Sequence, residues 1–250
     1  MLINKCPICE STAVMDAKAD LRICLKCNHL FKNVFVGKEA YKNYRSSTHL
    51  DLPGDHLKNS KQAALFRFKM FDAFAKKGSS VLEIGCGHSC FLDILTENGY
   101  KAEGTELSEP LVEELKYKMY LGNPSEIKDL PKYDNICAFH LIEHLNEPLK
   151  EIRCLVDHMS EDGVFVFEIP ALVFYTNKLD INKIYESAHT QYFNQKSIMI
   201  MLEKCGLTPV SQVNYWSGFY QIGTALIAAV KTETADLKKH FESSMKYMVR

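Results

Sequence analysis

The sequence lacks three features that would assign it to a membrane, secreted or nucleic-acid-coating protein. It has no uninterrupted apolar run near the roughly 18 residues of a membrane span, and residues 1–7 lack the apolar core of a signal peptide. Its formal net charge is only −1 at pH 7, whereas broad nucleic-acid binding normally requires a concentrated basic face. It also lacks internal repeats and low-complexity segments. We therefore expect a soluble, cytoplasmic protein of 250 residues, with one large domain and a small appendage.

Nine cysteines are present, but their placement does not predict a disulfide framework. Four of them form two Cys-x-x-Cys pairs, Cys6–Cys9 and Cys24–Cys27, separated by fourteen residues. Each pair can form a turn that aims two thiolates at one point, and four thiolates around Zn²⁺ make a closed structural site. Residues 1–36 are too few to fold on a hydrophobic core alone, so bound zinc would supply their stability.

The alternative interpretation of these pairs is a coincidence of two redox motifs. His29 follows Cys27 too closely to be needed as a zinc ligand. The remaining five cysteines lie in apolar or motif contexts, and we expect them to be small buried hydrophobes: Cys86, Cys90, Cys137, Cys154 and Cys205.

A glycine turn at residues 85–87 is the strongest signal of a ligand site. The apolar run at residues 80–84 predicts a strand, and apolar residues at helical spacing follow the turn. Glycines let a ligand approach main-chain N–H groups without a Cβ in the way. Glu106 ends the next apolar segment, 19 residues after Gly87, where a carboxylate can accept hydrogen bonds from ribose hydroxyls. A dinucleotide fingerprint would need Gly or Ala where this chain has Cys90, so the pattern favours another nucleoside cofactor.

Three segments together resemble one enzyme family. Residues 81–87, Val-Leu-Glu-Ile-Gly-Cys-Gly, resemble motif I of class I S-adenosylmethionine-dependent methyltransferases. Residues 133–145 resemble the motif of that family's fourth strand, and residues 186–194 resemble the His-x-x-Tyr-Phe-Ser segment of its small-molecule branch. The resemblance covers roughly residues 78–231. One departure is Ser89, where the family usually has a third glycine; serine is small and tolerable at a helix N-terminus.

The resemblance implies an α/β fold with a Rossmann-like, mostly parallel sheet whose last strand is antiparallel. It implies an S-adenosylmethionine site formed by Glu83, Gly85, Cys86, Gly87, Glu106, Leu107, Glu126, Phe139 and His140. The expected divisions are a zinc-binding module (1–36), a connector and lid helix (37–77), the methyltransferase domain (78–231) and a C-terminal amphipathic helix (232–250). That last helix could dimerise, although packing on its own domain is the more common use of such a helix.

Alternating strand and helix patterns support this division. From Leu57 a helix should place Ala64, Leu65, Phe68, Phe71 and Ala75 on one face. Ser108 followed by Glu109 and Pro110 predicts a helix that runs through Tyr120. Later elements are expected at 133–139 (strand), 149–159 (helix), 164–169 (strand), 195–205 (helix), 209–215 (strand) and 223–231 (strand).

The segment His140-Leu141-Ile142-Glu143-His144 matches a zinc-protease pattern, but that pattern needs a helix, and Asn146 and Pro148 interrupt one here. At the carboxyl end of a parallel strand these residues point into the crevice where ligands bind. The resemblance implies that Glu143 and His144 hold substrate or a second, catalytic divalent metal.

Methyl transfer needs an acceptor that is positioned and deprotonated, and a histidine near its free pKa suits that task. Candidates are His140, His144 and His189, with His144 and His189 favoured by their motif positions. The expected catalytic set is His144, His189, Glu143 and, as a further group, Tyr192.

The acceptor is argued by elimination. Enzymes that methylate exocyclic amines of nucleic-acid bases commonly carry Asn-Pro-Pro-Tyr or Asp-Pro-Pro-Tyr after strand four, whereas this chain has Ala-Phe-His-Leu at 138–141. The combined motifs look more like bacterial methyltransferases that act on nucleotide sugars and on capsule and surface-polysaccharide precursors, which makes O-methylation of an activated sugar the first expectation. A zinc-ribbon RNA methyltransferase and a catalytically inactive binding module remain alternatives.

Overall fold

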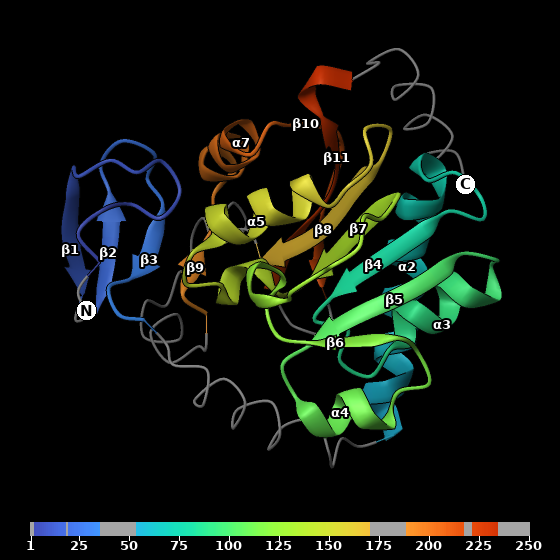
Figure 1. The fold of residues 1–250 in the computed structure, drawn as a ribbon. Coiled ribbons are helices and arrows are strands. Elements are labelled where there is room, and N and C mark those ends of the chain that lie inside the picture. The colour runs from blue at the N-terminus through green and yellow to red at the C-terminus, as the bar shows by residue number, and fades with distance from the viewer. Residues whose placement is uncertain (1–2, 19, 36–53, 171–188, 218–221, 235–250) are drawn as a thin grey trace.

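A computed structural model of the chain describes residues 3–18, 20–35, 54–170, 189–217 and 222–234. Its main feature is a 7-stranded sheet covered on both faces by helices (Figure 1). The strands of this sheet are β4 (Ser80–Ile84), β5 (Lys101–Glu106), β6 (Met119–Leu121), β7 (Asn135–Phe139), β8 (Val164–Pro170), β10 (Leu207–Ser217) and β11 (Ile222–Lys231).

The strand order is β10-β11-β8-β7-β4-β5-β6. Strands β4 to β8 pair in parallel, while β11 pairs antiparallel with both β8 and β10. This confirms the expected Rossmann-like α/β architecture with an antiparallel final pair. The turn that follows β4 lies at the carboxyl edge of the parallel strands, near the middle of the sheet, and parallel sheets bind ligands at that edge.

The two faces of the sheet are covered by different helices, and the strand residues alternate between them. Helices α2 (Gly54–Phe74) and α3 (Cys90–Glu97) cover one face; α5 (Pro148–Asp157) and α7 (Gln195–Lys204) cover the other. In β8, Val164 and Val166 pack in the cluster that contains Phe71 of α2, whereas Phe165 and Phe167 pack in the cluster that contains Ile152 of α5. Each such buried side chain contributes roughly 1.5–3 kcal/mol, so the two-residue period fixes the register of the strand.

Helix α2 confirms the predicted helix but corrects one face position. Ala64 and Phe71 are buried as expected, while Leu65 is 53% exposed. Leu65 follows Ala64 by one residue, and therefore points about 100° away from the buried stripe. Met70, which the predicted face did not include, is fully buried.

The helix predicted to run through Tyr120 is wrong in its second half. Helix α4 spans Glu109–Glu114, Leu115 leaves the helical region at ψ 135°, and β6 follows as an edge strand beside β5. Tyr117 and Met119 pack toward one face of the sheet and Tyr120 toward the other, which is the alternation of a strand.

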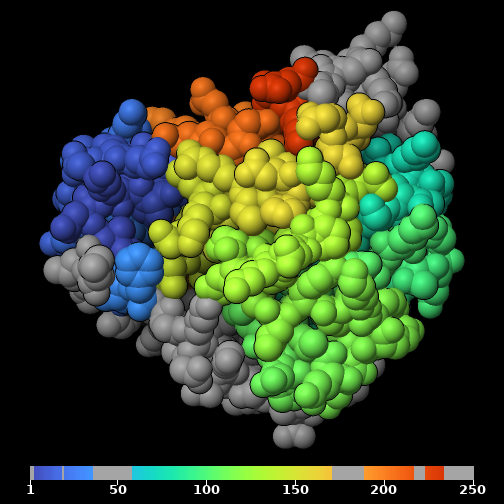
Figure 2. All heavy atoms as spheres, viewed as in Figure 1, coloured from blue at the N-terminus to red at the C-terminus, as the bar shows by residue number. Residues whose placement is uncertain are grey.

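The N-terminal segment forms a second sheet that it shares with the large domain. Its strands are β1 (Val14–Lys18), β2 (Leu21–Cys24), β3 (Leu30–Lys32) and β9 (Gln191–Tyr192), in the order β1-β2-β3-β9. Figure 2 shows this segment packed against the regions of α5 and α7. Ile8 and Phe31 belong to the same buried cluster as Phe193 and Ile198, so residues 3–35 complete their core with side chains from the large domain.

Several predictions fall partly outside the described residues. These are residues 37–53 of the connector, residues 186–188 of the 186–194 motif and residues 235–250 of the C-terminal helix. The boundaries proposed between the divisions stay predictions. In the described part of the chain, no helix combines the length and the apolarity needed to cross a bilayer.

Candidate functional site

The glycine turn lies between the end of β4 and the start of α3, as the sequence predicts. Gly85 and Gly87 have φ of 68° and 53°, a region that favours glycine. A Cβ on Gly85 would also lie 3.0 Å from Cδ1 of Leu141, which closes the space beside the turn. Ser89 is the N-cap of α3, but it too is left-handed, with φ of 58° and no capping hydrogen bond from its side chain. The substitution at the family's third glycine therefore costs backbone strain and contributes no capping bond.

Glu106 lies at the carboxyl end of β5, beside the turn, and is 2% exposed. Its Oε2 accepts a hydrogen bond from the Gly87 N–H at 3.1 Å, and its Oε1 accepts one from the Leu107 N–H at 2.7 Å. The carboxylate therefore fastens the glycine turn to β5. This is the placement required of a side chain that receives ribose hydroxyls at this edge.

The other residues expected to bind the cofactor lie in β4, in the glycine turn, at the end of β7 and in a short turn after β6. Glu83 is buried within β4, and Cys86 is buried in the turn itself. Phe139 ends β7, where its ring packs edge-on against Phe91 with centroids 4.7 Å apart. Glu126 belongs to the single turn η1 (Pro124–Glu126), where Oε2 accepts a hydrogen bond from the Asn123 N–H at 3.4 Å, so part of its hydrogen-bonding capacity caps that turn.

A buried ionic network at the ends of β7 and β8 was missed from the sequence. Glu168 of β8 accepts hydrogen bonds from Arg67 of α2 at 2.5 and 3.1 Å and from the hydroxyl of Tyr215 at 2.7 Å. Nε2 of His140 lies 2.8 Å from Glu168, and Nδ1 lies 3.2 Å from Oε1 of Glu143. The signals that could have revealed it are an acid in the otherwise apolar strand 164–169 and an arginine on the buried face of α2.

The network holds His140 in an unusual state. Its φ is 50°, a strained conformation for a non-glycine residue at a strand end. Burial alone would lower the pKa of its imidazole, but the carboxylates of Glu143 and Glu168 outweigh burial and raise that pKa to about 9. His140 is therefore positively charged at neutral pH and unsuited to act as a general base. It stays in place as a cationic link between two buried acids.

Glu143, His144 and His189 form a second cluster beside this network. Their ligand atoms all lie within 4.8 Å of one another, and the two imidazole centroids are 4.8 Å apart. Burial lowers the pKa of His189, which keeps its ring neutral near pH 7. Burial would raise the pKa of Glu143, but the neighbouring His140 outweighs it and lowers that pKa. The predicted Tyr192 lies close by, and its hydroxyl donates to the carbonyl of His189 at 2.9 Å.

These residues follow a strand and do not lie within a long helix. Strand β7 ends at Phe139, and only the single turn η2 (Ile142–His144) follows before Leu145 leaves the helical region. The helix that a zinc-protease motif requires is therefore missing from this described segment. The cluster instead lies at the carboxyl edge of the sheet.

The four cysteines of the two Cys-x-x-Cys pairs converge, as their spacing predicts. All four are buried free thiols, with Cys6 and Cys27 sulfurs 3.6 Å apart and Cys9 and Cys24 sulfurs 3.4 Å apart. Four sulfurs at about 2.3 Å from a tetrahedral Zn²⁺ would be about 3.8 Å apart. The thiol positions therefore fit zinc. His29 is not part of this group of four thiols. Its Nε2 instead lies 3.0 Å from Oε1 of Gln191.

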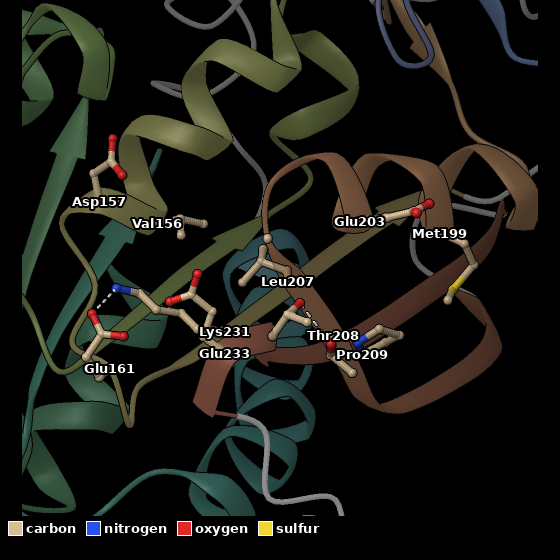
Figure 3. Close-up of a pocket in the computed structure, with 12 residues that line it drawn as sticks. Val156, Asp157, Glu161, Met199, Glu203, Leu207, Thr208, Pro209, Lys231 and Glu233 are labelled. Atoms are coloured by element: carbon tan, nitrogen blue, oxygen red, sulfur yellow. Dashed lines mark hydrogen bonds and ion pairs between the residues drawn. The ribbon is translucent and has the colours of Figure 1, made fainter.

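A separate pocket lies at the opposite edge of the sheet (Figure 3). Because Val230 of β11 pairs with Val164 at the start of β8, this pocket lies at the amino-terminal edge of the parallel strands, away from the glycine turn. Lys231 and Glu161 form an ion pair of 2.8 Å across it. Further acids line it: Asp157, Glu203 and Glu233. None of the predicted site residues contributes to its described lining.

Comparison with known proteins identifies the large domain. A family model described as a methyltransferase domain matches residues 58–212, more than half of the chain. Curated relatives from strains of Coxiella burnetii, named ubiquinone biosynthesis O-methyltransferase, are 28% identical over 101 residues, which is 36% of this chain and 43% of the relative. The chain therefore spans less than half the length of the curated relatives it matches.

Solved structures share the fold at low sequence identity. A Burkholderia thailandensis 1,6-didemethyltoxoflavin-N1-methyltransferase, solved with 1,6-didemethyltoxoflavin and S-adenosylhomocysteine, aligns at a TM-score of 0.61 with 15% identity, over 86% of this chain and 100% of that one. The magnesium protoporphyrin IX methyltransferase of Synechocystis PCC 6803, solved with S-adenosylhomocysteine, aligns at 0.56 with 15% identity, over 79% and 96%. At these identities the likeness establishes the fold alone.

Proposed function

The chain belongs to the methyltransferase domain family, and from this premise we propose that it transfers the methyl group of S-adenosylmethionine to a hydroxyl of a small molecule. The observation that supports the proposal most is the shared edge of the sheet. The glycine turn with Glu106 follows β4 and β5, and the cluster of Glu143, His144 and His189 follows β7. The carboxyl ends of neighbouring parallel strands meet at one edge, so a cofactor and an acceptor would lie side by side there.

The cofactor side would use the turn and the acid that fastens it. A carboxylate has about four lone-pair sites, so Glu106 would accept hydrogen bonds from ribose hydroxyls in addition to those from backbone N–H groups, while the Gly85–Gly87 backbone lies against the cofactor. S-adenosylmethionine supplies an electrophilic methyl group, so the chain itself need only bind, orient and deprotonate.

The acceptor side would use His189 and His144. Burial lowers the pKa of His189, so its ring is neutral near pH 7 and would accept a proton, while Glu143 beside it has a lowered pKa and would stabilise the imidazolium that forms. The proton of the acceptor hydroxyl would pass to an imidazole nitrogen of His189 or His144. His140 is excluded from this role because its raised pKa keeps it protonated.

We propose a nucleotide-activated sugar, as a precursor of a surface polysaccharide, as the first acceptor class. The second class is a hydroxyl of a quinone precursor, because the matched curated relatives are named ubiquinone biosynthesis O-methyltransferase. Both present a weakly acidic hydroxyl that needs a base, so the cluster serves either.

The test is formation of S-adenosylhomocysteine with nucleotide sugars, dihydroxy aromatics and RNA as separate acceptors. Turnover should appear with a hydroxyl-bearing small molecule, and His189→Asn or His144→Asn should lower it about 10²–10⁴-fold while cofactor affinity is preserved. His158→Asn is the matched control, because His158 caps α5 far from the cluster. Turnover with RNA alone, or equal losses in all three variants, would contradict the proposal.

A divalent metal at the cluster is the second candidate mechanism for the same reaction. One carboxylate and two imidazoles are a ligand set that first-row divalent ions accept, and their ligand atoms lie within 4.8 Å of one another. In that case turnover should disappear after metal removal and return with an added divalent ion, and Glu143→Gln should abolish the return. Full turnover in metal-free buffer would exclude the metal mechanism, and the histidine base would remain as the mechanism.

We also propose that Cys6, Cys9, Cys24 and Cys27 hold a structural Zn²⁺. The four-thiolate shell leaves no open coordination position, so this ion would stabilise the N-terminal sheet and take no part in the chemistry.

A further inference from the structure

A chain of buried hydrogen bonds joins the N-terminal sheet to the histidine cluster. His29, which precedes β3, and Gln191, in β9, are 0% and 1% exposed. Nε2 of His29 lies 3.0 Å from Oε1 of Gln191, and Nε2 of Gln191 donates to the carbonyl of Leu145 at 3.0 Å. Three segments far apart in sequence are thereby linked in one line.

The chemistry of the groups permits only one orientation of this chain. The Leu145 carbonyl can only accept, so the amide of Gln191 must face it with its NH₂ group. The amide oxygen then faces His29, and Nε2 of His29 must carry the proton that it donates. Each side chain is therefore fixed in both position and rotation.

This chain of hydrogen bonds ends at the two backbone segments that carry the candidate catalytic residues. Leu145 directly follows the turn η2, which contains Glu143 and His144. Thr190 fastens the same turn, with its N–H bonded to the Glu143 carbonyl at 2.8 Å and its hydroxyl to the Leu145 carbonyl at 3.1 Å. His189 is the residue immediately before Thr190. The two histidines thus stand on backbone segments that Gln191 and Thr190 hold together.

The N-terminal sheet holds these segments from the other side. Strand β3 pairs with β9, with Phe31 opposite Gln191, and the Lys32 N–H donates to the Thr190 carbonyl at 2.9 Å. His29 in turn follows Cys27 of the four-thiol cluster by two residues, so the fold around that cluster determines where His29 lies.

We propose that His29 and Gln191 are positioning residues that set the spacing between His144 and His189. Through them, the N-terminal module acts on the acceptor site without touching the acceptor. The inference rests on the proposed function, in that the histidine pair is taken to act on the acceptor. A displacement near 1 Å in such a pair can cost about 10²-fold in rate, so a module remote from the chemistry can control it.

The test compares four variants by NMR of the imidazole nitrogens and by kinetics. His29→Phe and Gln191→Met remove the hydrogen bonds between His29, Gln191 and Leu145. His29→Gln keeps an N–H donor near the position of Nε2, and Lys196→Met is the matched control. Lys196 donates to the Lys26 carbonyl at 2.7 Å, so its loss removes a contact between α7 and the module that does not involve η2. The imidazole resonances of His144 and His189 are assigned with single His→Gln variants.

The two chain-breaking variants should shift the resonances of both His144 and His189 and lower kcat about 10–100-fold, with affinity for S-adenosylmethionine unchanged. His29→Gln should restore the resonances and most of kcat, and Lys196→Met should change neither. The inference is overturned if His29→Phe moves neither resonance, if Lys196→Met has the same effect, or if kcat, cofactor affinity and melting temperature all fall together. Absence of turnover in the wild-type protein would instead refute the proposed function, while the resonances would still decide the positioning role.

Discussion

Replacing Glu168 with glutamine would show how strongly the buried ionic network stabilises the fold. Glu168 is fully buried and receives hydrogen bonds from Arg67 and Tyr215, with His140 at 2.8 Å. Glutamine keeps one acceptor oxygen but removes the charge, and its NH₂ group would face cationic donors. Removal of one partner from a buried ion pair typically costs about 3–5 kcal/mol, because the remaining charge stays buried without compensation. For a chain of this size that cost corresponds to a fall of roughly 6–20 °C in melting temperature.

The measurement is unfolding by denaturant and by heat, with Glu161→Gln as the matched control. Glu161 pairs with Lys231 at 2.8 Å but is 64% exposed, so the same change of carboxylate to amide should have little effect on stability there, because solvent screens a surface ion pair. If Glu168→Gln is as stable as Glu161→Gln, the network contributes little to stability, and the ion pair of Arg67 with Glu168 does not hold α2 on β8.

Three further predictions concern His140, the four-cysteine cluster and Ser89. The pKa of His140 is raised to about 9 from 6.5, so its stabilising contribution is complete below pH 6.5 and is lost as the pH rises toward 9; unfolding measured over that range should show a decline that His140→Gln removes. Elemental analysis should find one zinc per chain, and Cys24→Ser should unfold the N-terminal sheet while most helicity by circular dichroism remains, whereas four reactive thiols and no zinc would refute the site. Ser89→Gly should stabilise the protein by about 1 kcal/mol, since it relieves a left-handed backbone that has no capping bond, and an unchanged unfolding midpoint would show that no strain exists there.

The elements with strong local signals could be predicted from the sequence. The glycine turn, the acid at the end of β5 and the buried strand at 164–169 each follow from residue types at short range. The helix predicted through Tyr120 failed because Met119–Leu121 is too short to show its alternation against the helical pattern before it, and the edge of β5 decided the outcome. Leu65 failed for a similar reason, since its burial depends on which way α2 is rotated on the sheet.

Contacts between distant segments could not be predicted in this way. Glu168 and Arg67 are 101 residues apart, and His29 and Gln191 are 162 apart. Glu168 and Arg67 each stand out in an apolar context, but only the packing of α2 on β8, like that of β3 on β9, shows which residues become partners. The raised pKa of His140 depends on two such acids, which is why the sequence left it among the candidate bases and the structure removes it.

Calorimetric titration with S-adenosylmethionine tests the central claim most directly. The account predicts saturable binding at one site, and at least tenfold weaker binding by Glu106→Ala, because two hydrogen bonds to an ionised carboxylate are worth about 1.5–3 kcal/mol each. Glu103→Ala, on the same strand but bonded to Tyr120 and Tyr133, should bind normally and shows whether damage to β5 alone explains a loss. No binding by the wild-type protein, tighter binding of NAD, or equal affinity in wild type and Glu106→Ala would contradict the account.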